Sequence, residues 1–343
     1  MVESEQKVAP IKMNFSYIYK VNFNNNDPKL DDLTKEFNNL KIFEDGDSRH
    51  PGEGFKDFDD DFKIDVIVKP NAKYPESKDP DDQDSENVKK MRYEISISNN
   101  NILTKRFRYE KYFEGKKEAQ IREGDIFWIK SCNVILIKGS LEACRKINDY
   151  LTKFTTAGFD KIDFEHDFLL WLVYKYQESE GKLSNDFEFM KIVRGRTQGT
   201  DSNENDISFR DCQSRMVPLT QIYGLLNDHE ISHIGGFFKF RDEYKISLKI
   251  ATDLSIHLYS DLILSGKSYL EKCNLAIPVI LEIIYIFESW KKLSPKNKFP
   301  DETFFESMKQ SFKEQIDDAL QGFDSLNSRY AELRCENGVD NGS

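Results

Sequence analysis

Alternating apolar and polar residues dominate the first third of the chain. Between Met13 and Phe23 nearly every second residue is large and apolar, which is the period of a strand with one buried face. The same alternation recurs over residues 62–68, 93–97 and 103–109. Because Asn99-Asn100-Asn101 separates the last two segments, the pattern predicts a hairpin there.

Two short apolar runs and a helical pattern follow each other between residues 126 and 154. Ser140 is a suitable N-cap for the helix, whose apolar stripe includes Cys144, Ile147 and Leu151. The unit Ile126-Phe127-Trp128-Ile129, then Val134-Ile135-Leu136-Ile137-Lys138-Gly139-Ser140, then the helix, resembles one half-repeat of the saddle of TATA-box-binding proteins. This resemblance is an analogy of architecture over about forty residues, and it implies a local β-β-α arrangement.

The second half of the chain combines helical and strand periods. Residues 168–176 are apolar around most of a helix, which predicts a buried helix, and the polar run 195–206 predicts a loop. Three alternating segments between residues 231 and 259 predict a meander. The last helix carries an apolar stripe suited to a core face or to a partner helix: Phe304, Met308, Phe312, Ile316, Leu320 and Phe323.

These patterns predict an α+β fold in two regions. Residues 1–158 form a strand-rich region with the β-β-α unit and an acidic mobile loop at 70–90, which has almost no large apolar residue. Residues 159–334 form a region of helices packed on the three-stranded antiparallel meander at 231–259, and residues 335–343 form a frayed tail. One continuous domain is the alternative.

Composition narrows the class of protein. The 343 residues are 38% hydrophobic and carry a net charge of -11, so the chain is globular and any nucleic-acid site must be a local basic patch. The first thirty residues contain no apolar core of a secretory signal, and the five cysteines form no C-x-x-C pair. The apolar run 275–287 is too short to span a membrane. We expect a cytoplasmic protein without membrane contact.

The pentapeptide His229-Glu230-Ile231-Ser232-His233 matches the H-E-x-x-H pattern of zinc peptidases. In a helix, His229 and His233 would lie one turn apart as zinc ligands, and Glu230 would act as general base on a metal-bound water. Glu282, an isolated carboxylate in an apolar run, is the best third ligand. Zn²⁺ is therefore the cofactor of this alternative, and no cofactor is predicted otherwise.

The flanks of the pentapeptide favour a strand instead. Asn227-Asp228 is a turn pair, and Ile234, Gly236, Phe238 and Phe240 would share one face of a strand beginning here. A strand cannot present both histidines and the glutamate as zinc peptidases do. The conformation of residues 227–234 therefore decides between the two interpretations.

Basic residues mark the second candidate site. Residues 105–113 interleave cations with aromatics on a predicted strand, which suits phosphate binding and base stacking as well as an ordinary amphipathic strand. A smaller basic cluster lies beside the polar loop. The candidate nucleic-acid-binding residues are Lys105, Arg106, Arg108, Lys111, Lys191, Arg194 and Arg196.

The sequence carries no Walker A motif, no dinucleotide-binding fingerprint and no G-x-S-x-G elbow. The lead hypothesis is therefore an intracellular binding or assembly protein that associates with nucleic acid in an antiviral defence or mobile-element setting. A protein partner or a homo-oligomer fits this hypothesis. The alternative is the zinc-dependent metallopeptidase, and whether the chain is an enzyme stays open.

Overall fold

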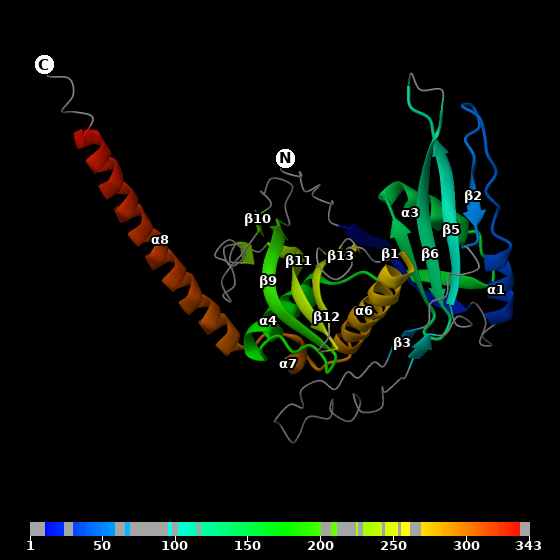
Figure 1. Cartoon of the computed structure of the whole chain (residues 1–343). Helices are drawn as coiled ribbons and strands as arrows, with labels where there is room; N and C mark the ends of the chain where they lie inside the picture. The colour runs from blue at the N-terminus through cyan, green and yellow to red at the C-terminus, as the bar shows by residue number, and fades with distance from the viewer. Residues whose placement is uncertain are drawn as a thin grey trace, which may run out of the picture.

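The computed structural model describes residues 11–23, 30–58, 66–68, 95–97, 102–114, 118–199, 207–210, 224–225, 229–241, 244–252, 255–260 and 269–336. Within these ranges the chain has the expected α+β class, with a large antiparallel sheet and helices (Figure 1). The predicted loop at 70–90 lies outside the described residues, as do residues 337–343 of the predicted tail.

One eleven-stranded sheet runs through the described chain in the order β10-β9-β11-β12-β13-β1-β7-β6-β5-β2, with β8 also pairing with β1. The strands of this sheet are β1 (Ile11–Phe23), β2 (Glu53–Lys56), β5 (Ile102–Lys111), β6 (Gln120–Ile129), β7 (Val134–Gly139), β8 (Ala157–Lys161), β9 (Phe187–Gln198), β10 (Ile207–Arg210), β11 (Glu230–Phe240), β12 (Tyr244–Ala251) and β13 (Ile256–Ser260). A separate two-stranded sheet consists of β3 (Val66–Val68) and β4 (Ile95–Ile97).

Strand β1 joins the two halves of the sheet. Its first residues pair with β13, whereas its later residues pair with β7 on one side and with β8 on the other. The predicted boundary at residue 158 falls inside β8. The hydrogen-bonded ladder is therefore continuous between the two predicted regions, and their division into domains stays a prediction.

The predicted meander is present as β11, β12 and β13, which pair in sequence order. Its neighbour β9 was not predicted, and residues 195–198 of this strand were assigned to a polar loop. Thr197 is nevertheless buried and pairs with Ile231 of β11, which explains why this polar segment continues the strand. The predicted hairpin is also wrong, since β4 pairs with β3 and β5 pairs with β2 and β6.

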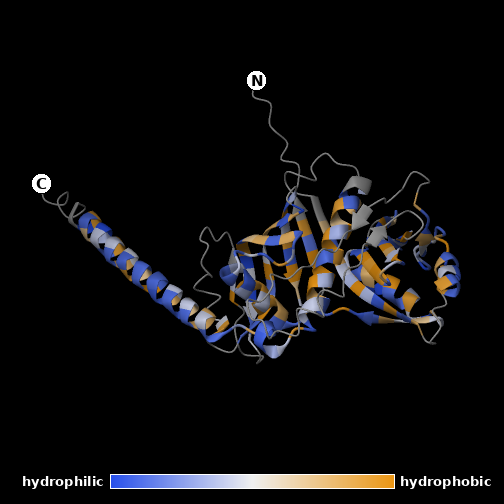
Figure 2. Ribbon diagram, turned by 90° about the horizontal axis from the view of Figure 1, so that it is seen from below, coloured by the Kyte–Doolittle hydropathy of each residue, from blue (hydrophilic) through white to orange (hydrophobic). Residues whose placement is uncertain are grey.

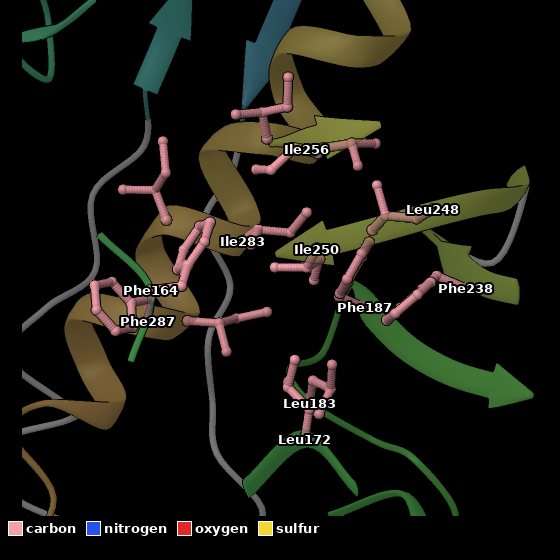
Figure 3. Packing of buried hydrophobic residues seen from close by; sticks show 14 of the residues in the cluster. Phe164, Leu172, Leu183, Phe187, Phe238, Leu248, Ile250, Ile256, Ile283 and Phe287 are labelled. Atoms are coloured by element: carbon pink, nitrogen blue, oxygen red, sulfur yellow. The ribbon is translucent and has the colours of Figure 1, made fainter. Parts of the chain in front are cut away.

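Helices α4 (His166–Glu178) and α6 (Tyr269–Trp290) pack on the inner face of the second half of the sheet. Phe187, Phe238 and Leu248 on the strands belong to the same core as Ile283 and Phe287 of α6, where Phe287 packs on Phe164 (Figure 3). Helix α6 contains the one described segment apolar and long enough to cross a membrane, Lys272–Trp290. Because 78% of that segment is buried inside the structure, α6 is a core helix.

A second core fills the first half of the molecule. Helices α1 (Leu30–Asn38) and α3 (Leu141–Leu151) pack there against β5, β6 and β7. The predicted N-cap is present, since Oγ of Ser140 accepts a hydrogen bond from N of Ala143 at 3.2 Å. The structure describes two further helices, the short α7 (Pro295–Lys298) and the long α8 (Glu302–Glu336), which extends away from the body (Figure 1).

Candidate functional site

The pentapeptide lies in extended backbone. Glu230 through His233 belong to β11, and His229 immediately precedes that strand. Extended residues four apart have Cα atoms separated by about 13 Å, against about 6 Å along a helix. The helical conformation required by the zinc interpretation is therefore absent, and the strand alternative is the one that the structure shows.

Glu230 has a partner of its own in the fold. Its Oε2 lies 2.8 Å from Nε2 of His166, the first residue of α4, while Nδ1 of the same ring lies 3.0 Å from the carbonyl oxygen of Ile231. His166 therefore bridges a side chain and the backbone of β11. This contact ties the start of α4 to the start of β11 and engages the carboxylate proposed as general base.

The side chain of Glu282, on α6, is hydrogen-bonded inside the hydrophobic core and not near the pentapeptide. Its side chain is buried, and Oγ of Ser184 donates a hydrogen bond to Oε1 of Glu282 at 2.7 Å. Burial raises the pKa of Glu282 to about 7. Among the described residues no group of three or more His, Cys, Asp and Glu side chains is placed to hold a metal ion. His229, His233 and Glu282 are thus not brought together.

The cations of β5 are all engaged by carboxylates of the same chain. Lys105 pairs with Asp57, Arg106 with Asp125, Arg108 with Glu123, and Lys111 with Glu142, at distances of 2.6 to 2.8 Å. The pairs of Arg106 and Arg108 follow from the register, in which Asp125 and Glu123 of β6 lie directly opposite. Because carboxylates neutralise these four cations, β5 has little positive charge left to bind phosphates.

The aromatics between these cations belong to the core. Phe107 and Tyr109 are buried, and they pack in the cluster that includes Phe55 and Trp128. They are not available to stack on bases. The amphipathic-strand interpretation of residues 105–113 therefore agrees with the described contacts better than a nucleic-acid surface does.

The residues around Asp125, which lies opposite the middle of β5, form a polar cluster rather than an open site. Asp125 accepts a hydrogen bond from Nε of Arg106 at 2.8 Å, another from Nζ of Lys138 at 3.4 Å, and a third from the hydroxyl of Tyr269 in α6. Burial raises the pKa of the neighbouring thiol of Cys273 to about 12, so that thiol stays protonated at neutral pH. The cluster anchors α6 to the first half of the sheet.

The remaining three candidate cations lie on β9, and the register places them beside further cations that were not selected from the sequence. On β11, β12 and β13 the inner-face residues alternate with positions on the opposite, outer face. Figure 2 shows this alternation as blue and orange bands along the strands. The outer-face cations are Lys191, Arg194 and Arg196 of β9, Lys239 of β11, and Lys245 and Lys249 of β12.

We call these six residues, together with His233, Phe237 and His257, the basic sheet face. Lys191 lies opposite Phe237, Arg196 opposite His233, and Lys249 opposite His257. Nζ of Lys245 sits 4.6 Å from the centre of the Phe237 ring. At the described positions paired with His233 to Lys239, the one carboxylate is Glu188, which lies 3.9 Å from Nζ of Lys239.

The inner residues of the same strands explain why the cations face outward. Phe189, Phe238, Leu248 and Ile250 are buried against α4 and α6, so their neighbours along each strand must point to the other side. The signal for Lys245 and Lys249 was present in the sequence as alternation around Ile246 and Leu248. The sequence alone could not predict that these lysines lie beside the cations of β9, because that arrangement depends on the pairing of β9 with β11.

Comparison with protein-family models and with curated protein sequences gives no match for this chain.

Proposed function

We propose that the protein is an intracellular nucleic-acid-binding protein whose basic sheet face holds the backbone of a single strand. The observation that carries this proposal is the gathering of six cations from three adjacent strands on one side of the sheet. They stand against a net charge of -11 for the whole chain, so the positive charge is strongly local. Such a patch attracts a polyanion even in an acidic protein.

The shape of the surface favours a single strand over a duplex. A sheet face is broad, and the described helices α4 and α6 pack on its other side, so neither projects from the basic sheet face as a helix that enters the major groove would. Phe237 stands near the middle of the basic sheet face, between Lys191 on β9 and Ser247 on β12. Because every base has a π face, an aromatic ring among cations can bind single strands with little sequence preference.

The basic sheet face replaces the surface first expected for this function. Arg106 and Arg108 have short ion pairs with β6, whereas Lys191, Arg194 and Arg196 belong to the proposed site. The inner side of the same strands is filled by hydrophobic side chains, and α4 and α6 pack on that side. The sheet is thus a scaffold that is supported from one side and presents charge on the other.

The test is binding of a labelled single-stranded oligonucleotide of about 16 nucleotides, followed by fluorescence anisotropy at low salt. We expect Lys191→Glu combined with Lys245→Glu to weaken binding by at least tenfold. The matched control is Lys35→Glu combined with Lys153→Glu, which makes the same change in charge at exposed lysines of the first half. The control should bind like the unchanged protein.

Three outcomes would contradict the proposal. The first is the absence of binding by the unchanged protein at low salt. The second is an equal loss in the control variant, which would show that overall charge rather than the basic sheet face governs binding. The third is tighter binding of duplex than of single strand, which would overturn the proposed substrate class.

A further inference from the structure

Helix α8 is far longer than the surface on which it packs. Only its first turns contact the body, where Phe304 and Met308 are buried and Phe304 lies edge-on against Tyr174 of α4. From residue 317 to residue 334 every described side chain is exposed. Both views of the whole chain show this part of the helix extending away from the body (Figures 1 and 2).

The projecting part nevertheless carries an apolar stripe with a seven-residue period. Its positions alternate by three and four residues, which is the pattern of a helix that packs along another helix. In heptad notation the d positions are Phe312, Ala319, Leu326 and Leu333, and the a positions are Ile316, Phe323 and Tyr330.

The folded chain covers only the start of this stripe, where Phe312 and Ile316 are half-buried and Phe312 packs against the body, and it leaves the stripe exposed from Ala319 onward. Phe323 is 68% exposed and Tyr330 is 56% exposed, and Leu326 and Leu333 are also well exposed. Scattered single apolar residues are ordinary on a surface, but a regular stripe over three heptads is not. The first interpretation of the stripe as a core face therefore holds only where α8 meets the body.

We propose that two copies of the chain associate through this stripe as an antiparallel coiled coil of their α8 helices. In such a pair an a position of one helix faces a d position of the other. The alignment that places Phe323 opposite Ala319 of the second copy matches a large side chain with a small one. It also sets Ile316 opposite Leu326 and Tyr330 opposite Phe312, so the layers between residues 312 and 330 are filled by apolar side chains.

The flanking charges distinguish this arrangement from a parallel one. In a parallel pair, Arg329 of each helix would lie beside Arg334 of the other, which brings like charges together twice. In the antiparallel alignment Arg334 instead lies beside Glu306 of the second copy. Lys313 then lies beside Asn327, so the alignment contains a complementary pair and no repulsive one.

Gly322 fits the same alignment. A glycine in the middle of a helix is destabilising, and a Cβ on Gly322 would meet nothing within 4 Å in the single chain. The single chain therefore gives no packing reason for glycine at this position. In the antiparallel pair the two Gly322 residues lie next to the twofold axis, which passes at residue 321, and their missing side chains let the two backbones approach.

The experiment is sedimentation equilibrium of the full chain over a range of micromolar concentrations. We expect a monomer–dimer equilibrium that Phe323→Glu weakens at least tenfold. Gln321→Glu, which places the same residue two positions away on the outside of the coil, should leave the equilibrium unchanged. Circular dichroism should show the same helix content in both variants. A monomeric unchanged protein, or equal weakening by both variants, would overturn the proposal.

A charge exchange tests the orientation. Glu306→Arg should weaken the dimer because it sets a second guanidinium beside Arg334, and adding Arg334→Glu in the same chain should restore it. A parallel pair predicts instead that Arg334→Glu alone strengthens association, since it removes the contact with Arg329. That result, or failure of the double variant to restore the dimer, would overturn the antiparallel arrangement.

Discussion

Nε of Arg106 donates a hydrogen bond to Oδ1 of Asp125 at 2.8 Å, and the side chain of Asp125 is only 5% exposed. Removing the guanidinium would leave a buried carboxylate with Lys138 and Tyr269 as its remaining partners. We expect Arg106→Ala to lower the free energy of unfolding by about 3 kcal/mol, measured by urea denaturation.

The neighbouring cation provides the control. Arg108 pairs with Glu123, whose side chain is 36% exposed, so water can replace the lost partner. Arg108→Ala should therefore cost less than about 1 kcal/mol. Equal destabilisation by the two variants would show that burial of Asp125 is not what makes the first pair important.

The buried carboxyl of Glu282 should make stability depend on pH. Burial raises its pKa to about 7 in the folded state, above the value of 4.5 for an exposed glutamate. A group with a raised folded pKa stabilises the protein below its unfolded pKa and loses that contribution as the pH rises through the folded value. We expect Glu282→Gln to increase stability at pH 8 by up to about 3 kcal/mol relative to the unchanged protein.

Urea denaturation at pH 5 and at pH 8 checks this expectation. The exposed Glu118 offers a matched control, because Glu118→Gln removes the same charge outside the core. That control should leave the difference in stability between the two pH values unchanged. A Glu282→Gln variant with the same pH dependence as the unchanged protein would contradict the prediction.

Zinc content tests what remains of the metallopeptidase alternative. Because residues 230–233 are extended and Glu230 contacts His166, we expect less than one equivalent of zinc after purification without chelators. Elemental analysis of the unchanged protein measures it directly. An equimolar content that Glu282→Gln or His233→Ala abolishes would restore the metal site.

The salt dependence of single-strand binding should show whether an individual cation of the basic sheet face contacts a phosphate. Each phosphate contact to a single strand contributes about 0.7 to the slope of log K against log salt concentration. We therefore expect Lys191→Ala to reduce that slope by about this amount in anisotropy titrations between low and moderate salt. A lower affinity with an unchanged slope would mean that Lys191 acts on folding rather than on phosphate.

Local sequence patterns predicted those strands and helices in which buried and exposed residues recur at a regular spacing. The alternation from Met13 to Phe23 marked most of β1, and the capping Ser140 marked the start of α3 correctly. Strand β9 was not predicted, and its residues 195–198 were assigned to a loop, because Gly195 and Thr197 are small or polar residues on its buried side. Such positions carry no hydrophobic signal when the chain is read one residue at a time.

The candidate site depended on pairings between distant segments. Lys191 and Lys245 are 54 positions apart in the chain, and they share a face only because β9 and β12 both pair with β11. Likewise, no local pattern shows that Arg106 lies opposite Asp125. The basic residues of β5 and β9 were recognisable in the sequence, but the carboxylates that pair with the cations of β5 were not.

The position of β1 has a consequence for how the protein is made. Ile11 pairs with Ser260, so the first described strand to be synthesised stays without this partner until β13, the last described strand, has been made. Until then residues 11–15 of β1 have no native partner on the edge where β8 pairs with residues 19–23, and an unpaired edge can recruit other chains. Slow translation or truncation before β13 should therefore promote aggregation of nascent chains.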